Sequence, residues 1–197
     1  MSIYLSIDLD YWNKLRDYSH MVWFLKKAIQ STNNIKIVDS HEELIKHVNN
    51  SGCERLINVD YHSDISNRYD TRFDYGDVFN CGTWVSFVKF GIKKQGQYTW
   101  MMPYALDWAK TEGYCHSPAD KSANPFVNPK VSGWLKTNQI SINEHYPEKL
   151  IEWDKIGGVG IAFSYEWLDN KTEDEIVKRA VVALKTKPLK NNRCKLH

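Results

Sequence analysis

Short, largely apolar runs alternate with amphipathic segments through residues 1–60. The apolar runs have the length and composition of strands in a sheet covered on both faces, and they occupy residues 3–7, 35–38 and 56–59. Ser19 is placed to cap a helix over residues 20–30, and a second helical segment, 42–50, ends before Gly52. This alternation of strand and helix is typical of a parallel α/β sheet.

The pattern is less regular after residue 60. Four further elements are expected, namely a helix at 82–90, a strand at 98–102, a long irregular loop at 113–133 and a buried strand at 157–165. Thr172 and Glu175 have the spacing of a capping box at the start of a last helix, which we expect to end near Lys185. Because the chain contains neither an internal repeat nor a low-complexity linker, we predict one three-layer α/β/α domain with a mainly parallel sheet over residues 1–197. Residues from about 186 to 197 would form its basic C-terminal tail.

The composition narrows the class of protein. With 42% hydrophobic and 25% charged residues, the chain has the make-up of an ordinary globular protein. A formal net charge of +2 provides no general attraction to nucleic acid or to a membrane surface, so we expect neither partner. The 4 cysteines contain no Cys-x-x-Cys pair, and no signal-peptide or transmembrane pattern is evident, so we expect a reduced, cytoplasmic location. Nothing in the sequence indicates the oligomeric state.

Acidic and imidazole side chains follow three of the predicted strands. Since ligands of open α/β sheets bind beyond the carboxyl ends of the strands, we expect these side chains to converge on one crevice. The candidate metal ligands are Asp8, Asp10, His41, Asp60, His62 and Asp64. Residues two apart in an extended chain project to the same face, so Asp60, His62 and Asp64 should point one way. Each pattern alone has a simpler interpretation, because acidic residues commonly cap turns and His41 can cap a helix or face solvent.

The types of ligand indicate manganese. Carboxylate oxygens with some imidazole suit Mn²⁺, and the absence of cysteine from the cluster argues against structural zinc. Two such ions held close together generate a hydroxide nucleophile at neutral pH, so no side chain needs to be the nucleophile. The sequence therefore predicts a two-metal hydrolase.

Four segments resemble motifs of the ureohydrolases, the arginase and agmatinase family. VDYHSDI at 59–65 resembles the family's Asp-Ala-His-Thr-Asp motif, VDSHEEL at 38–44 its Gly-Asp-His-Ser segment, and SIDLDYW at 6–12 its Ser-Phe-Asp-Val-Asp segment. NCGTWVSF at 80–87 is similar to the Asn-Leu-His-Gly stretch that follows the metal site. The Asp-x-Asp segment opens this chain but comes late in ureohydrolases, so the order looks circularly permuted. With its short length, the chain is most similar to the small peptide arginases.

The resemblance implies an arginase-like fold with a permuted strand order and two Mn²⁺ ions per chain. One ion would be held by His41, Asp60, Asp64 and Asp8, and the other by His62, Asp60, Asp8 and Asp10. A hydroxide bridging the ions would attack the guanidinium carbon of an arginine in a peptide, the precursor of a ribosomal natural product, and give ornithine and urea. Asp64 would pass a proton to the leaving amine.

Two further roles are assigned to candidates elsewhere in the chain. The histidine of the family's Asn-Leu-His-Gly segment has no counterpart here, because Asn80 and Cys81 occupy that place, and His116 is the candidate substitute for proton transfer to solvent. A guanidinium also requires a carboxylate that orients it through paired hydrogen bonds. Glu166, after the last predicted strand, is the first candidate for this role and Glu42 is the second.

Two alternatives stay open at the level of sequence. An apolar strand before Asp8-Leu-Asp10 also resembles the start of haloacid-dehalogenase-type phosphatases, with Asp8 as nucleophile. That interpretation leaves His41, His62 and Asp64 without a role, and Trp12 stands where a threonine or valine usually follows. The other alternative is a non-catalytic module that binds peptides and keeps a structural metal.

Overall fold

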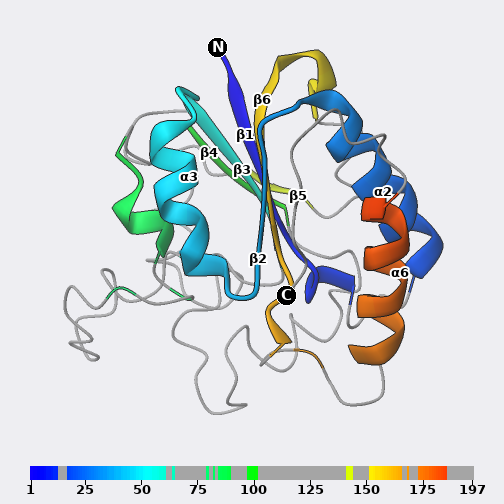
Figure 1. Ribbon diagram of the computed structural model, residues 1–197. Helices are drawn as coiled ribbons and strands as arrows, with labels where there is room; N and C mark the ends of the chain where they lie inside the picture. The colour runs from blue at the N-terminus through cyan, green and yellow to red at the C-terminus, as the bar shows by residue number, and fades with distance from the viewer. Residues whose placement is uncertain are drawn as a thin grey trace.

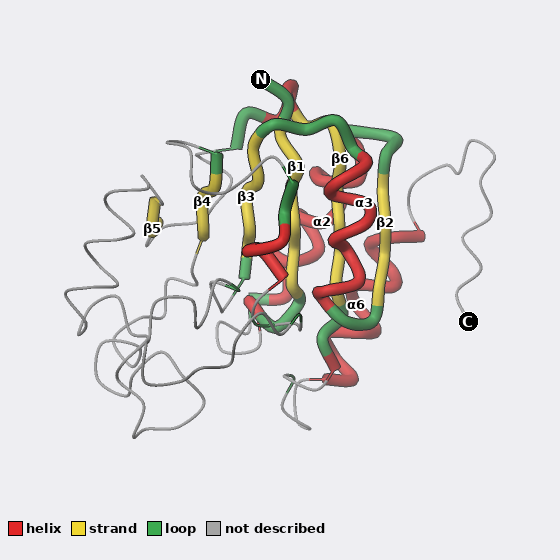
Figure 2. Tube along the Cα trace, turned by 90° about the vertical axis from the view of Figure 1, so that its left-hand side faces the viewer, coloured by secondary structure: helices red, strands yellow, loops and turns green. Residues whose placement is uncertain are grey.

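Six strands form one sheet in which every hydrogen-bonded pair is parallel. The computed structural model describes residues 1–12, 17–60, 64, 79, 82, 84–89, 97–101, 141–143, 151–165, 168 and 173–185. The strands are β1 (Ile3–Asp8), β2 (Ile35–Val38), β3 (Arg55–Val59), β4 (Tyr98–Met101), β5 (Ser141–Asn143) and β6 (Ile156–Ala162). Their order across the sheet is β2-β6-β1-β3-β4-β5, with β5 and β2 at the two edges (Figure 2). The predicted parallel sheet is confirmed.

Helices cover both faces of this sheet (Figure 1). The helices α2 (Tyr18–Ser31) and α6 (Glu173–Lys185) pack against each other on one face, and α3 (Ile45–Asn50) lies on the other. Within the described ranges, shorter 3-10 helices are η1 (His41–Leu44), η2 (Trp84–Phe87) and η5 (Trp153–Lys155). The three-layer α/β/α architecture predicted from the sequence is therefore confirmed.

The core lies between the sheet and the pair α2 and α6. β1 is buried along its whole length, between β6 on one side and β3 on the other. Apolar side chains of the sheet, such as Ile7 and Ile161, belong to the same buried cluster as Phe24 of α2 and Ala180 of α6. Removing these surfaces from water stabilises the parallel arrangement, which brings the carboxyl ends of all the strands to one edge.

Glycines in β6 let the opposite layer approach the sheet closely. A Cβ atom at Gly160 would lie 2.6 Å from a methyl carbon of Leu44 and 2.6 Å from the hydroxyl oxygen of Tyr4. At Gly158 a Cβ would lie 2.8 Å from the Tyr4 ring. Leu44 is the last residue of η1, so the missing side chain at Gly160 allows η1, which begins at His41, to lie against the sheet.

The start of α2 differs from the prediction. The helix begins at Tyr18, and its N-cap is Asp17 rather than Ser19. Asp17 Oδ1 accepts a hydrogen bond from the backbone N–H of His20 at 3.0 Å, which satisfies one of the free N–H groups of the first turn. Aspartate and serine are both good N-caps, so the sequence alone is compatible with a helix capped by Asp17 or by Ser19.

Two other predicted helices differ in form from the prediction. The predicted helix at 42–50 is divided into η1 and α3, and Ser40 with Glu43 forms a capping box at its start. In the predicted helix at 82–90, the helical part that the structure describes is limited to η2. Each helical piece is short, so intrinsic helix propensity alone does not stabilise it.

Some predicted segments lie outside the described residues. These are the loop at 113–133, the capping residue Thr172 and the basic tail at 186–197. In the described part of the chain, no helix has the length and apolar character needed to cross a membrane.

Candidate metal centre

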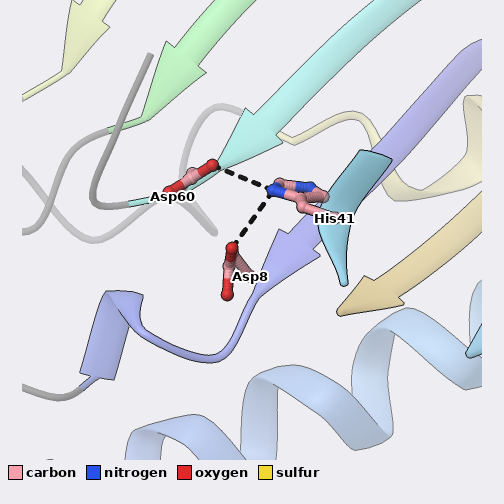
Figure 3. A group of neighbouring side chains, drawn as sticks. All are labelled: Asp8, His41 and Asp60. Carbon is pink, nitrogen blue, oxygen red and sulfur yellow. Dashed lines mark ion pairs between the residues drawn. The ribbon is translucent and has the colours of Figure 1, made fainter. Parts of the chain in front are cut away.

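Three elements deliver polar side chains to the carboxyl edge of the sheet (Figure 3). Asp8 is the last residue of β1, Asp60 directly follows β3, and His41 is the first residue of η1, three positions after the end of β2. In Figure 3 the two carboxylates point toward the His41 ring from different strands. Each offers one ligand atom, and these three atoms lie within 4.8 Å of one another. The predicted convergence of these three residues is confirmed.

The imidazole nitrogen Nδ1 of His41 is the centre of the cluster. It lies 3.1 Å from Asp8 Oδ2, 3.1 Å from Asp60 Oδ2 and 2.9 Å from Asp64 Oδ2. All four residues are buried, with exposed fractions of at most 4%. Despite the short distances, Nδ1 has no hydrogen bond of acceptable geometry within the described structure. A buried nitrogen that faces three acceptors without a hydrogen bond needs another partner.

The electrostatics of the cluster point to a cation. Burial acts to lower the pKa of His41, but the charge of Asp64 and the contacts with Asp60 and Asp8 outweigh it, so the pKa lies well above its ordinary value. One imidazole faces three carboxyl groups, each with an oxygen within 3.1 Å of its Nδ1, so the cluster is strongly acidic. Gathering several acidic groups around one buried nitrogen is costly unless a cation binds among them, so the cluster favours a bound divalent ion.

The spacing of the donor atoms fits such an ion. Donors about 2.1 Å from an octahedral ion lie about 3.0 Å from their neighbours in the coordination sphere. The distances of 2.9–3.1 Å from His41 Nδ1 to the three carboxylate oxygens match this value. The buried residues Asp8, His41 and Asp60 can therefore hold a metal ion.

Side chains at the carboxyl ends of β1 and β6 hold two of these donors. His41 Nε2 is hydrogen-bonded to Ser6 Oγ at 2.6 Å. When Nε2–H donates this bond, the neutral ring presents the lone pair of Nδ1 to the cluster. Ser164, which follows β6, donates a hydrogen bond from its hydroxyl to Asp8 Oδ2 at 2.7 Å. Both bonds are buried and fix the orientation of the donor groups.

The other two donors are held in the same way. Asn58 Nδ2 donates to Asp60 Oδ2 at 3.0 Å, and the indole N–H of Trp84 donates to Asp64 Oδ2 at 2.6 Å. The Trp84 ring also packs against the ring of His41, with centroids 4.8 Å apart. Each of the four converging side chains thus has a separate hydrogen-bond partner, as is usual for the ligands of a metal site.

Two residues at the site have left-handed backbone conformations. Asp64 has a φ of 51° and Ser164 a φ of 47°, and they are the two non-glycine residues with positive φ in the described part of the chain. Such a conformation costs an L residue about 1–2 kcal/mol. Asp64 itself is therefore not extended, as the prediction assumed, but its carboxylate lies beside His41 together with that of Asp60, as expected.

The remaining predicted residues have different outcomes. Asp10 is buried and its backbone N–H donates to Asp8 Oδ1 at 3.2 Å, but it is not part of the group of Asp8, His41 and Asp60. Glu42 accepts a hydrogen bond from the Ser40 hydroxyl within the capping region of η1. His62, His116 and Glu166 lie outside the described residues.

The fold and the site together define a class: an α/β/α protein with a buried acid–imidazole cluster that can hold a metal ion. No model of a known protein family, no curated protein and no solved structure matches the chain. A more specific activity is therefore proposed from the residues of the site.

Proposed function

We propose that the protein is a binuclear manganese hydrolase that converts arginine side chains of a peptide to ornithine and releases urea. The observation that carries the proposal is the arrangement around His41 Nδ1, where Asp8, Asp60 and Asp64 converge within 3.1 Å. These four residues come from three separate segments, and they are the four that the resemblance to ureohydrolases assigns to one manganese ion. The permuted order of the motifs does not prevent them from meeting.

The two ions of this proposal share ligands. His41, Asp60, Asp64 and Asp8 would hold the first ion, and His62, Asp60, Asp8 and Asp10 would hold the second. When bound, the ions would lower the pKa of water at the site and so supply a nucleophile at neutral pH. Hydrolysis then breaks a bond between the guanidinium carbon and nitrogen, adds the elements of water and leaves urea and the primary amine of ornithine.

The chain's own residues orient the reaction. The Trp84 hydrogen bond directs Asp64 Oδ2 toward His41, which leaves Asp64 Oδ1 to move a proton to the leaving amine. We assign orientation of the guanidinium to Glu166 and proton exchange with solvent to His116, as the sequence suggests. The peptide substrate follows from the resemblance to the small peptide arginases.

The direct test is mass spectrometry of an arginine-containing peptide incubated with the protein and Mn²⁺. We expect the mass loss that corresponds to replacing arginine with ornithine, together with free urea. Asp60→Asn should abolish both, because it removes a ligand shared by the two ions. Asp154→Asn is the matched control, since Asp154 lies in η5 at the start of β6 and therefore at the opposite edge of the sheet. An unchanged peptide mass with fully manganese-loaded protein would contradict the proposal.

The two alternatives predict different results in the same assay. A phosphatase with Asp8 as nucleophile would release phosphate from a phosphomonoester in Mg²⁺ and would leave the arginine peptide intact. In the structure, however, Asp8 is 3% exposed and both of its oxygens accept hydrogen bonds, from Asp10 N–H and from the Ser164 hydroxyl. A non-catalytic module would bind metal and peptide without producing urea.

A further inference from the structure

Ser164 lies between two strand ends: the end of β1, which carries Asp8, and the end of β2, which leads to His41. β6 lies between β1 and β2 in the sheet, and its last residue, Ala162, is in register with Asp8 on one side and with Val38 on the other. Ser164 follows two residues later and is fully buried. Its position therefore lets it contact both neighbouring strand ends at once.

Both hydrogen bonds of Ser164 use this position. Its backbone N–H donates to the carbonyl oxygen of Asp39 at 2.8 Å, two residues before His41. Its hydroxyl donates to Asp8 Oδ2 at 2.7 Å, the same oxygen that lies 3.1 Å from His41 Nδ1. The other oxygen of Asp8 accepts the N–H of Asp10. Two donors on different atoms thus prevent the Asp8 carboxylate from rotating.

The backbone of Ser164 gives an independent reason to look for a role. Its φ of 47° is a conformation that glycine adopts at little cost and that serine adopts rarely. A strained residue at a cluster of candidate ligands indicates that its side chain contributes something that glycine cannot supply. Compared with glycine, serine adds one hydrogen-bond donor, its hydroxyl group.

We propose that Ser164 is a positioning residue of the metal centre: its hydroxyl holds Asp8 Oδ2 at ligand distance from His41 and so raises the affinity for the divalent ion. This inference rests on the metal-binding part of the proposed function and does not depend on the substrate. Ser164 acts through Asp8 and need not touch the ion or the peptide.

The test compares Ser164→Gly with Ser164→Ala in the full chain. Both variants lack the hydroxyl, but glycine also relieves the backbone strain, whereas alanine keeps it. Mn²⁺ affinity is measured from the free-ion signal in electron paramagnetic resonance titrations, and heat stability is measured by circular dichroism in chelator. We expect both variants to bind Mn²⁺ about 10–100-fold more weakly than the wild type. In chelator, Ser164→Gly should unfold at a higher temperature than Ser164→Ala, because glycine relieves the backbone strain that alanine keeps.

Ser51→Gly is the matched control, because the Ser51 hydroxyl donates to Val48 O at the end of α3, toward the opposite edge of the sheet. It should bind Mn²⁺ like the wild type. Wild-type affinity for Mn²⁺ in Ser164→Gly would overturn the inference. If only Ser164→Ala bound Mn²⁺ weakly, the backbone conformation rather than the hydroxyl would be responsible. If neither Ser164 variant folded in chelator, the hydroxyl would have a purely structural role, and the inference would be wrong as well.

The same titration separates this inference from the proposed function. If the wild type binds no Mn²⁺, the metal centre and the role of Ser164 are both wrong. If the wild type binds Mn²⁺ and Ser164→Gly weakens the binding, the inference on Ser164 is supported even when the peptide assay shows no ornithine. In that case only the arginine chemistry is wrong.

Discussion

Single residues around the cluster hold the candidate ligands in place without being ligands themselves. Ser6 and Asn58 each stand two positions before a converging carboxylate in a largely apolar strand, and they therefore share its face of the sheet. A polar residue at such a position is a signal that sequence alone can provide. Ser164 and Trp84 carry no such signal, because their partners Asp8 and Asp64 are 156 and 20 positions away in the chain.

Trp84 offers a test at this scale. Trp84→Phe keeps an aromatic ring beside His41 but removes the N–H that donates to Asp64 Oδ2. A buried acceptor that loses its donor costs about 1–3 kcal/mol, so we expect the free energy of unfolding in chelator to fall by this amount. Mn²⁺ affinity should fall about 10-fold or more. Chemical denaturation and metal titration measure the two effects.

Trp23→Phe is the control for this substitution, because Trp23 lies in α2 and is 46% exposed. Addition of metal should also change the tryptophan fluorescence of the wild type. This change should be smaller in Trp84→Phe and of wild-type size in Trp23→Phe. Equal metal affinity and equal fluorescence response in the two variants would show that the Trp84 hydrogen bond has no part in the site.

At the scale of the elements, the sequence predicted the strands better than the helix ends. The prediction for β2 matches its observed bounds, Ile35–Val38. The last buried strand was predicted to continue to Tyr165 but ends at Ala162, because Ser164 turns into the left-handed region to reach its two partners. β5 was not predicted, since three residues with polar ends give no strand pattern and depend on pairing with β4.

Close packing between β6 and η1 gives a test at the element scale. Gly160→Ala would place a methyl group against the ends of the Leu44 and Tyr4 side chains, which must shift, and we expect buried Leu44 to carry η1 with it. Overpacking of this kind lowers the free energy of unfolding by about 1–3 kcal/mol. Because η1 begins at His41, Mn²⁺ affinity should fall as well. Denaturation and metal titration of the variant measure both effects.

A double-mutant cycle identifies the contact responsible. Leu44→Ala alone should cost about 2–5 kcal/mol through the cavity that it leaves. Since the new methyl group at Gly160 would fill part of that cavity, the two costs should sum to more than the cost of the double variant. Strictly additive costs would mean that Leu44 does not limit the approach of η1 to the sheet.

At the scale of the whole molecule, the parallel sheet explains why motifs distant in sequence form one site. The carboxyl ends of β1, β2 and β3 share one edge, so residues 8, 41 and 60 meet whatever their order along the chain. The fold class and this convergence followed from hydrophobic pattern and spacing. The left-handed turn at Asp64 did not, because nothing in its local sequence requires a positive φ.

Anomalous diffraction from crystals grown with Mn²⁺, recorded on both sides of the manganese absorption edge, tests the metal centre most directly. We predict one peak about 2.1 Å from His41 Nδ1, bounded by Asp8, Asp60 and Asp64, and a second peak on the other side of Asp8 and Asp60. A cluster without manganese, in which His41 Nδ1 donates a hydrogen bond to one of these carboxylates, would contradict the metal centre and the hydrolase proposed from it.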